Sequence, residues 1–267
     1  MRFCVLGSGS RGNATYVAAK SGGLLIDNGF SAVEIERRLA AIGVEAASLS
    51  AILLTHEHND HLKGVGVLAR KFGLPLHASA GTIAAAARTL VGVEAVHPFT
   101  TGTSFSLGGF SVHPFAVCHD TADPVGFVIR HGLCSLGYCT DTGTVSRVIR
   151  HHLAGCNGLV LECNHDPRML QNGPYPLQLK QRIRSRHGHL ANDQSAALIS
   201  DILHEKLFHV VLAHISETNN DPSLALDTVA AAAATVSRAR RPVVSLSWQD
   251  RPGEMIDLGR FGDDDDR

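Results

Sequence analysis

The sequence predicts an α/β fold in which two β-sheets pack face to face and helices cover their outer surfaces. Two observations lead to this prediction. Short apolar runs alternate with helical stretches in both halves of the chain, and a meander of strands lies between the halves. Such a succession is typical of sheets covered by helices. We expect a single domain over residues 1–258 and an acidic tail over residues 259–267.

The first half contains four predicted strands and three predicted helices. The strands are the short apolar runs Phe3–Leu6, Thr15–Ala18, Gly23–Ile26 and Ala51–Leu54. The helices are the longer stretches Ala32–Ala41, Leu62–Phe72 and Gly81–Leu90. Each strand is bounded by Gly, Ser, Asn or Asp, residues that favour turns.

The rest of the chain begins with the strand-rich stretch Glu94–Thr140, which has turns at residues 107–109 and 130–132. Helices and strands then alternate again. The predicted helices are Gly143–His151, Asp193–His204 and Pro222–Ser237, and the predicted strands are Gly158–Glu162, Phe208–Ala213 and Pro242–Leu246. We expect Gln171–His189 to be a long functional loop broken by a short helix, and Asp263–Asp266 to be disordered and solvated.

Composition limits the class of protein. The chain has 267 residues, of which 44% are hydrophobic, enough to bury a sizeable core. A net charge of −1 means that any nucleic-acid surface must be local. The six cysteines form no C-x-x-C pair, which favours reduced thiols. No apolar run approaches the roughly 20 residues of a membrane span. We therefore expect a cytoplasmic protein that does not bind a membrane.

The most informative segment is Thr55–His61, Thr-His-Glu-His-Asn-Asp-His, directly after the predicted strand Ala51–Leu54. In an extended segment His56 and His58 point the same way. As the next helix begins, Asp60 and His61 turn onto the other side of the same cavity. One loop would therefore supply ligands for two ions. Imidazole and carboxylate suit Zn²⁺, Mn²⁺ or Fe²⁺ better than Ca²⁺. A histidine-rich turn without metal is the alternative.

The pattern His56-x-His58-x-Asp60-His61 resembles the signature of the metallo-β-lactamase superfamily. The resemblance implies an αββα sandwich of two mixed sheets with a binuclear metal site at the sheet edge. It also implies a further histidine, a bridging aspartate and a last histidine along the chain. These residues are His119, Asp141 and His214, each at the end of a strand-like segment. His113 competes with His119 but lies inside its strand.

The resemblance assigns two ligand sets and two divalent ions, Zn²⁺ or Mn²⁺. The sets are His56, His58, His119 and Asp141 for one ion, and Asp60, His61, Asp141 and His214 for the other. Two such ions lower the pKa of a shared water from about 15.7 toward 7. The resulting bridging hydroxide would attack the substrate, which makes Asp60 part of the catalytic machinery. Asp27 resembles an aspartate that supports the ligand loop by hydrogen bonds.

His189 precedes the predicted helix Asp193–His204. A spare imidazole beside a binuclear centre suits protonation of an alkoxide leaving group. Together with His214-x-Ser216, this arrangement resembles the tRNase Z type of phosphodiesterase. His187 could act instead, and a helix-capping or exposed role for His189 is the alternative.

A wider resemblance covers almost the whole chain except the tail. It is carried by Ser8–Asn13, Thr55–His61, Thr140–Gly143, Glu162–Asp166, Gly173–Pro176 with Leu179–Ile183, Gly188–Leu190 and His214–Ser216. Together these segments resemble the WalJ (YycJ) family of single-domain nucleases. The resemblance implies a 5′→3′ DNA exonuclease connected to DNA repair. The chain departs from the family at Ala191, where serine is common.

Six residues are candidate substrate contacts: Ser10, Asn13, Asn164, His165, Lys180 and Arg182. The Gly/Ser loop around the first two could offer N–H groups to a terminal phosphate. The last two lie in a dense basic stretch that could contact the phosphate backbone of DNA. Turns stabilised by their own side chains and a solvated basic face are the alternatives.

Other functions remain open from the sequence alone. No second domain or stacking platform is evident, so a small cyclic phosphodiester or RNA could replace DNA as substrate. A lactonase, thioesterase or β-lactamase, or a metal-stabilised scaffold without activity, are further alternatives.

Overall fold

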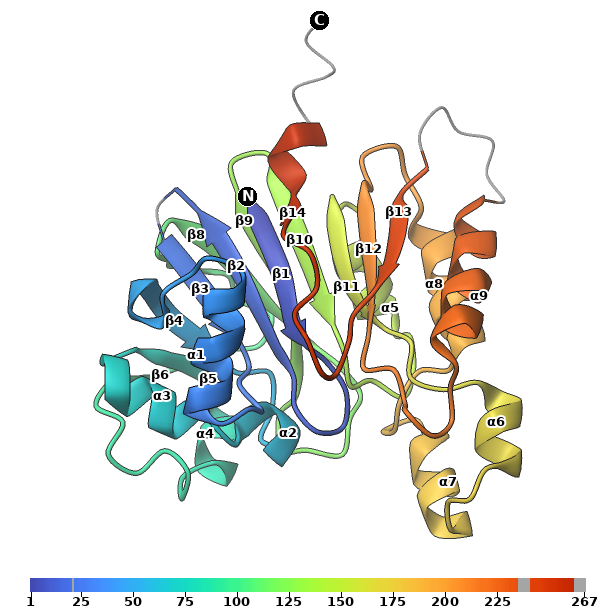
Figure 1. Cartoon of the computed structure of the whole chain (residues 1–267), viewed down its shortest axis with the longest axis horizontal. Helices are drawn as coiled ribbons and strands as arrows, with labels where there is room; N and C mark the ends of the chain where they lie inside the picture. Colours follow the sequence, from blue (N-terminus) through green and yellow to red (C-terminus); the bar gives the residue numbers. More distant parts are fainter. Residues whose placement is uncertain (21, 235–240, 262–267) are drawn as a thin grey trace, which may run out of the picture.

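The computed structural model describes residues 1–20, 22–234 and 241–261 and is built on two seven-stranded mixed sheets (Figure 1). The first sheet has the order β14 (Ile256–Asp257), β1 (Arg2–Gly7), β2 (Ala14–Ala19), β3 (Gly22–Ile26), β4 (Leu49–Leu53), β5 (Leu76–Ser79) and β6 (Val96–Phe99). The second has the order β13 (Val243–Leu246), β12 (His209–Ala213), β11 (Gly158–Glu162), β10 (Cys134–Cys139), β9 (Val125–His131), β8 (Phe110–Ala116) and β7 (Phe105–Leu107).

Each sheet combines a parallel part with an antiparallel part. In the first sheet β3, β4, β5 and β6 run parallel and the strands from β14 to β3 are antiparallel. In the second sheet β10 to β13 run parallel and β7 to β10 are antiparallel. The parallel strands are joined by crossovers that contain helices, as parallel pairing requires.

The core lies between the sheets and under the helices. Phe3 and Val5 point from β1 into the space between the sheets, where they join a buried cluster that includes Phe127 and Tyr138 of the second sheet. The alternate residues Cys4 and Leu6 face the opposite side. This period-2 alternation gives each sheet two apolar faces.

Helices cover both outer faces. The first sheet carries α1 (Ala32–Ala41), α3 (Val65–Phe72) and α4 (Ala80–Ala85), and the second carries α5 (Arg147–Leu153), α8 (Asn192–Ile202) and α9 (Pro222–Ala234) (Figure 1). Ile35 and Leu68 pack on the first outer face, and Ile149 and Leu198 on the second. The predicted αββα sandwich is confirmed.

Several local predictions differ from the structure. The predicted helix Leu62–Phe72 is two helices, α2 (Asn59–Leu62) and α3, separated at Gly64. A Cβ at Gly64 would lie 1.8 Å from the carbonyl oxygen of Phe30, so only glycine permits this close approach. The predicted helix Gly81–Leu90 ends as α4 at Ala85.

Short elements escaped prediction. The four-residue β5 and the two-residue β14 are too short to show a pattern, and a 3₁₀ turn at Leu258–Phe261 follows β14. The segment expected to be mainly loop contains the end of α6 (Pro167–Asn172) and α7 (Leu177–Ile183). The last residues of the predicted helix Pro222–Ser237, from 235 on, and the tail Asp263–Asp266 lie outside the described residues.

The fold brings the ends of several strands together. The segments that follow β3, β4, β8, β10, β11 and β12 meet at one edge of the sandwich, near α2 and α7 in Figure 1. This edge is where open α/β sheets usually bind ligands. In the described part of the chain no helix is long and apolar enough to cross a membrane.

Candidate metal centre

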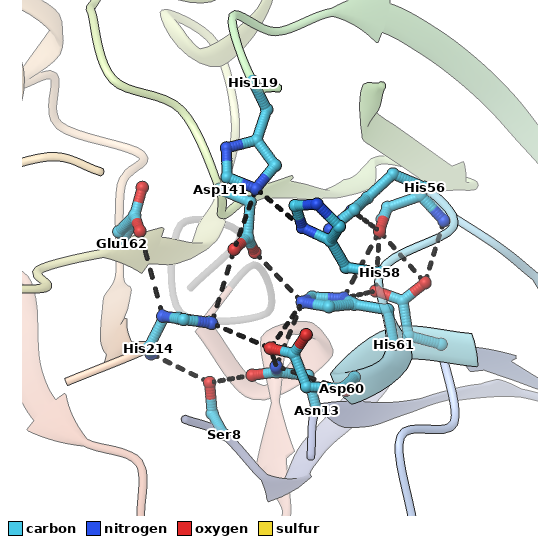
Figure 2. Close-up of polar contacts among 12 residues, drawn as sticks. Ser8, Asn13, His56, His58, Asp60, His61, His119, Asp141, Glu162 and His214 are labelled. Atoms are coloured by element: carbon cyan, nitrogen blue, oxygen red, sulfur yellow. Dashed lines mark hydrogen bonds and ion pairs between the residues drawn. The ribbon is translucent and has the colours of Figure 1, made fainter. Parts of the chain in front are cut away.

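Five histidines and two aspartates converge at this edge of the sandwich. They come from the β4–α2 loop and from the segments directly after β8, β10 and β12. Figure 2 shows their side chains turned toward a common space around the carboxylate of Asp141. They are His56, His58, Asp60, His61, His119, Asp141 and His214, the seven residues expected to bind metal.

Ligand-type side chains form four overlapping groups with metal-ligand spacing, and one of these groups combines Asp141 and His214 with Glu162 and His189. The ligand atoms of His56, His58 and His119 all lie within 4.8 Å of one another, and so do those of a second group, Asp60, His61 and His214. Asp141 joins the two groups. Its Oδ1 lies 3.8 Å from His119 Nε2, and its Oδ2 lies 3.2 Å from His61 Nε2. The arrangement brings together the residues of the two ligand sets expected from the sequence, and the division into those two sets stays a prediction.

Neighbouring groups orient two of the imidazoles. Nδ1 of His61 lies 2.8 Å from the buried carboxylate of Asp27. Nδ1 of His56 lies 2.9 Å from the hydroxyl of Thr55, and that hydroxyl donates to Asp27. A hydrogen bond to one ring nitrogen fixes the ring and leaves the other nitrogen as ligand. Asp27 thus occupies the supporting position expected for it.

The donor set fits divalent metal ions. Nε2 of His56 is buried and makes no hydrogen bond in the described structure, although a buried polar nitrogen normally has a partner. It points into a group of nitrogen and oxygen ligands. Imidazole with carboxylate is the donor combination of Zn²⁺ and related transition metals.

Electrostatics within the cluster shift several pKa values. Burial opposes the charged form of Asp141, but His214 and His61 hold the pKa of its carboxyl well below the usual range. Burial likewise opposes charge on His214, yet Asp141 and Asp60 raise its pKa to about 9. Asp141 and Asp27 raise the pKa of His61 well above its ordinary value against the same burial effect. The metal-free site therefore holds protons on two of its ligands at neutral pH.

This protonation predicts that metal binding releases protons. Metal ions bind neutral imidazole, so about two protons, from His61 and His214, should leave when both ions bind near pH 7. Affinity should accordingly weaken as pH falls. Calorimetric titrations with Zn²⁺ in buffers of different ionisation enthalpy measure the number released. His214→Ala should lower it by about one, and a heat independent of the buffer would contradict the prediction.

Three ligand-region residues have left-handed backbone conformations. The φ angles are 58° at Asp27, 57° at Asp141 and 55° at His214. Aspartate tolerates this region and histidine is also enriched there, but such residues remain uncommon. Asp27 and His214 directly follow β3 and β12, and Asp141 lies two residues after β10. At Asp141 and His214 the side chain lines the cavity, whereas the side chain of Asp27 is buried behind the ligands. Strain of this kind is typical of functional sites.

The Ser8–Asn13 loop packs under the second ligand group. The amide of Asn13 accepts hydrogen bonds from the Ser8 hydroxyl and the Gly9 N–H, and its Nδ2 lies 3.2 Å from Asp60 Oδ2. Asn13 is completely buried. Sequence reasoning expected Asn13 to contact substrate, whereas the structure places it beneath the ligands, where it positions the loop.

His189 lies beside the ligands and is paired with Glu162. Its Nδ1 lies 2.7 Å from Oε1 of Glu162, which is fully buried at the end of β11. The other carboxylate oxygen accepts from the N–H groups of Thr142 and Leu190. Sequence analysis assigned no role to Glu162. The sequence did offer one indication of a role, because Glu162 is a charged residue at the end of an otherwise apolar strand.

Gly188 allows the turn that carries His189. A Cβ there would lie 2.1 Å from the carbonyl oxygen of Ile183 and 2.3 Å from that of Arg182. The Gly188 carbonyl also lies 3.1 Å from Nδ1 of His119. Gly188 therefore helps to position both His119 and His189.

Gly188→Ala is expected to lower the free energy of unfolding by about 1–3 kcal/mol, because the methyl group would meet fixed backbone atoms. Activity should fall as well, since His119 and His189 would move. Gly155→Ala is the matched control, because a Cβ at Gly155 meets nothing within 4 Å. Urea denaturation of both variants measures the difference. Equal transition midpoints would contradict the prediction.

The ligands open into a cavity of about 400 Å³. Ser10, Asn164, Arg182 and His189 line it together with five of the metal-ligand candidates, His58, Asp60, His119, Asp141 and His214. Seven lining residues were not among the candidate site residues, namely Asn59, Asp120, Tyr175, Leu179, Ile183, Gly188 and Ser216. Tyr175 supplies an aromatic surface, which sequence analysis did not recognise.

Two expected substrate contacts lie elsewhere. Lys180 lines a different hollow, and its Nζ donates to the carbonyl of Gln171. His165 is buried outside the cavity lining, and burial lowers its pKa to about 4. Arg182 lines the cavity, and its Nε donates to Asp120 at 2.6 Å.

Comparison with known proteins agrees with this geometry. The family model "Beta-lactamase superfamily domain" matches residues 23–215, which contain all seven candidate ligands. The chain belongs to this superfamily. Within the superfamily, exodeoxyribonuclease YycJ of Bacillus anthracis is 37% identical over 227 residues, covering 84% of the chain and 86% of that protein. The prediction of a superfamily member resembling WalJ (YycJ) is confirmed.

A second relative supports the same assignment, and a solved structure shows the same fold. Exodeoxyribonuclease WalJ of Streptococcus pneumoniae serotype 2 (strain D39) is 36% identical over 228 residues, covering 84% of the chain and 85% of that protein. Zn²⁺-bound PqqB from Methylobacterium extorquens has the same fold, with a TM-score of 0.71 and 20% identity over 96% of the chain and 100% of PqqB. The predicted class, a metal-dependent hydrolase, is confirmed by the family and its named relatives.

Proposed function

We propose that the chain is an exodeoxyribonuclease that hydrolyses DNA from 5′ ends and uses two divalent ions, Zn²⁺ or Mn²⁺. The observation that carries the proposal is the His189–Glu162 pair beside two ligand groups joined at Asp141. The names of the relatives with 36–37% identity point to the same reaction. Zinc in PqqB supports the choice of metal.

The proposed site assigns one task to each group. His56, His58 and His119 would hold one ion, and Asp60, His61 and His214 the other, with Asp141 between them. Bound there, the ions would polarise the phosphodiester and lower the pKa of water. The chain's own residues then orient the substrate and move protons.

His189 is the proposed proton donor. Glu162 accepts from Nδ1, so Nε2 remains, and Nε2 makes no hydrogen bond within the described part of the chain. His189 lines the cavity, where the oxygen of a leaving nucleotide would lie. A positioned donor of this kind typically contributes 10²–10⁴-fold. A thioester has less need of it, because its thiolate leaving group departs without a proton.

Arg182 and Tyr175 are the proposed contacts for the nucleotide beside the site. The side chain of Arg182 is 56% exposed while its Nε is held by Asp120, so its remaining N–H groups can reach a phosphate. Tyr175 offers a ring on which a base can stack, a sequence-independent contact.

Incubation with end-labelled linear duplex DNA tests the proposal. With Mn²⁺ or Zn²⁺ the protein should release nucleotides from linear DNA and leave covalently closed circles intact, because an exonuclease requires an end. Chelator should stop the reaction. Turnover of RNA or bis(p-nitrophenyl) phosphate without degradation of linear DNA would replace this proposal by the alternative substrates.

A further inference from the structure

Helix α7 lies between two hollows of the molecular surface. The metal cavity is on one side of the helix. On the other side is a hollow of about 560 Å³, which is lined by Gln171, Leu177, Lys180, Gln181 and Arg184. We call this second space the Lys180 hollow. None of the lining residues in the described part of the chain is acidic.

The spacing of residues along α7 accounts for this division. The residues of α7 that line the metal cavity are three and four positions apart, namely Leu179, Arg182 and Ile183. The residues that line the Lys180 hollow repeat this spacing, namely Leu177, Lys180, Gln181 and Arg184. Residues spaced in this way share one face of a helix. The helix therefore presents one face to each hollow, and none of its residues is buried.

The C-terminal end of α7 is anchored beside the reacting groups. The N–H of His189 donates to the carbonyl of Ile183 at 2.9 Å, so the turn that carries the proposed proton donor is joined to the helix. Nε of Arg182 donates to Asp120 at 2.6 Å. Figure 1 shows α7 below the strands of the second sheet, apart from the layer that α8 and α9 form. An anchored helix thus projects from the sandwich next to the metal cavity.

The N-terminal end of α7 carries apolar side chains. Leu177 is 67% exposed, and the exposed Pro176 directly precedes it. Tyr175, one residue earlier, lines the metal cavity. A single exposed leucine is common, but this one follows a tyrosine and a proline at the boundary between the two hollows. Leucine and proline are among the side chains that proteins insert between stacked bases of DNA.

The face of α7 toward the Lys180 hollow is positively charged. Nζ of Lys180 donates to the carbonyl of Gln171, which leaves two of its three N–H groups for another acceptor. Arg184 is exposed and lies four positions further along the same face. Since no acidic side chain of the described residues lines this hollow, its charge suits the phosphate backbone of a nucleic-acid strand.

We propose that α7 parts the two strands of a DNA end, so that the degraded strand enters the metal cavity and the complementary strand crosses the Lys180 hollow. This inference rests on the proposed function. A helix with its side chains is about 10–12 Å wide, so α7 would occupy the space between the two backbones that paired bases fill in a duplex. Leu177 would cover the first unpaired base of the complementary strand, while Lys180 and Arg184 would contact its phosphates.

The size of the metal cavity gives a reason for parting the strands. Its volume of about 400 Å³ is near the lower end of the range for a pocket that holds one small ligand. A whole base pair with its two backbones exceeds that space, so the terminal nucleotide has to leave its partner before it reacts. Unpairing and unstacking cost free energy. Contacts of Leu177 with the exposed base would offset part of that cost.

Initial rates on two linear duplexes test the inference with Mn²⁺-loaded protein. One duplex is paired to its end, and the other has the same degraded strand but several mismatched terminal pairs, so its strands are already parted. Leu177→Ala should slow release of the first nucleotide from the paired end about tenfold and leave the mismatched end nearly unchanged. Val33→Ala is the matched control, because Val33 is 77% exposed on α1, which covers the first sheet. It should change neither rate.

Binding in the presence of chelator gives a second readout that needs no hydrolysis. With 2-aminopurine in the last pair of the complementary strand, the wild-type protein should raise the fluorescence, because the base loses its stacking, and Leu177→Ala should raise it less. Arg184→Ala should reduce the slope of log affinity against log salt by about one for the duplex but not for the degraded strand alone. Lys206→Ala removes an exposed lysine before β12, at the opposite end of that strand from His214, and should reduce neither slope.

The outcomes separate this inference from the proposed function. Equal effects of Leu177→Ala on paired and mismatched ends, or no effect on either, would overturn the inference while the nuclease stands. A 2-aminopurine signal that stays constant when the protein binds would do the same. Absence of any hydrolysis of linear DNA would instead overturn the proposed function.

Discussion

Asp141→Asn is expected to lower the rate of DNA hydrolysis by more than about a hundredfold and to reduce the number of tightly bound ions. Asp141 alone lies between both ligand groups, with His119 Nε2 at 3.8 Å and His61 Nε2 at 3.2 Å. Loss of a residue that merely orients a ligand already costs about 10–100-fold. Loss of the shared carboxylate should cost more, because it weakens both sites together.

Asparagine is the informative substitution at Asp141. It has nearly the same shape, and it accepts the left-handed backbone at φ 57°. Its amide removes the negative charge that offsets the protons of His61 and His214. The fold should therefore persist while metal binding fails.

The measurements are metal content by elemental analysis and initial rates at several Mn²⁺ concentrations. Asp201→Asn is the matched control. Asp201 lies on α8, is half-exposed and forms an ion pair with Arg150. It should retain both ions and full activity. If Asp141→Asn also retained two ions and near-normal rates, the central role of Asp141 would be refuted.

The ligand cluster was predictable because its residues occupy strand ends. His56, Asp141 and His214 follow apolar runs that are recognisable as strands, and the parallel parts of both sheets bring those ends to one edge. The family pattern supplied the order of the ligands. The left-handed turns at Asp141 and His214 were not visible, since neither residue is glycine or asparagine.

The basic stretch shows why a secondary-structure error becomes a site error. As a loop, Lys180 and Arg182 could both reach the same substrate. In the helix α7 they are two positions apart and point to different sides, because only residues three or four apart share a helix face. Arg182 consequently lines the metal cavity, whereas Lys180 lines another hollow.

Other parts of the site depend on contacts between distant segments. Glu162 and His189 are 27 positions apart and meet only because β11 ends beside the turn that precedes α8. No periodicity or spacing in the sequence predicts a contact of this kind.

Glu162→Gln is expected to lower kcat on DNA by about 10²–10⁴-fold with little change in metal content. The carboxylate accepts from Nδ1 of His189, which leaves Nε2 to carry the proton for the leaving oxygen. A glutamine can still accept from the N–H groups of Thr142 and Leu190. Its amide cannot stabilise a positively charged imidazole, so His189 would lose its function as proton donor.

A substrate that needs no proton donor distinguishes this role from a structural one. The leaving group of thymidine 5′-p-nitrophenyl phosphate departs as a stable anion, so both Glu162→Gln and His189→Ala should be far less impaired on this ester than on DNA. The double variant should be about as slow on DNA as either single variant, because the two residues act as one unit. Equal losses on both substrates would mean that Glu162 acts through the backbone of Thr142 and Leu190. In that case the assignment of His189 as proton donor would have to be given up.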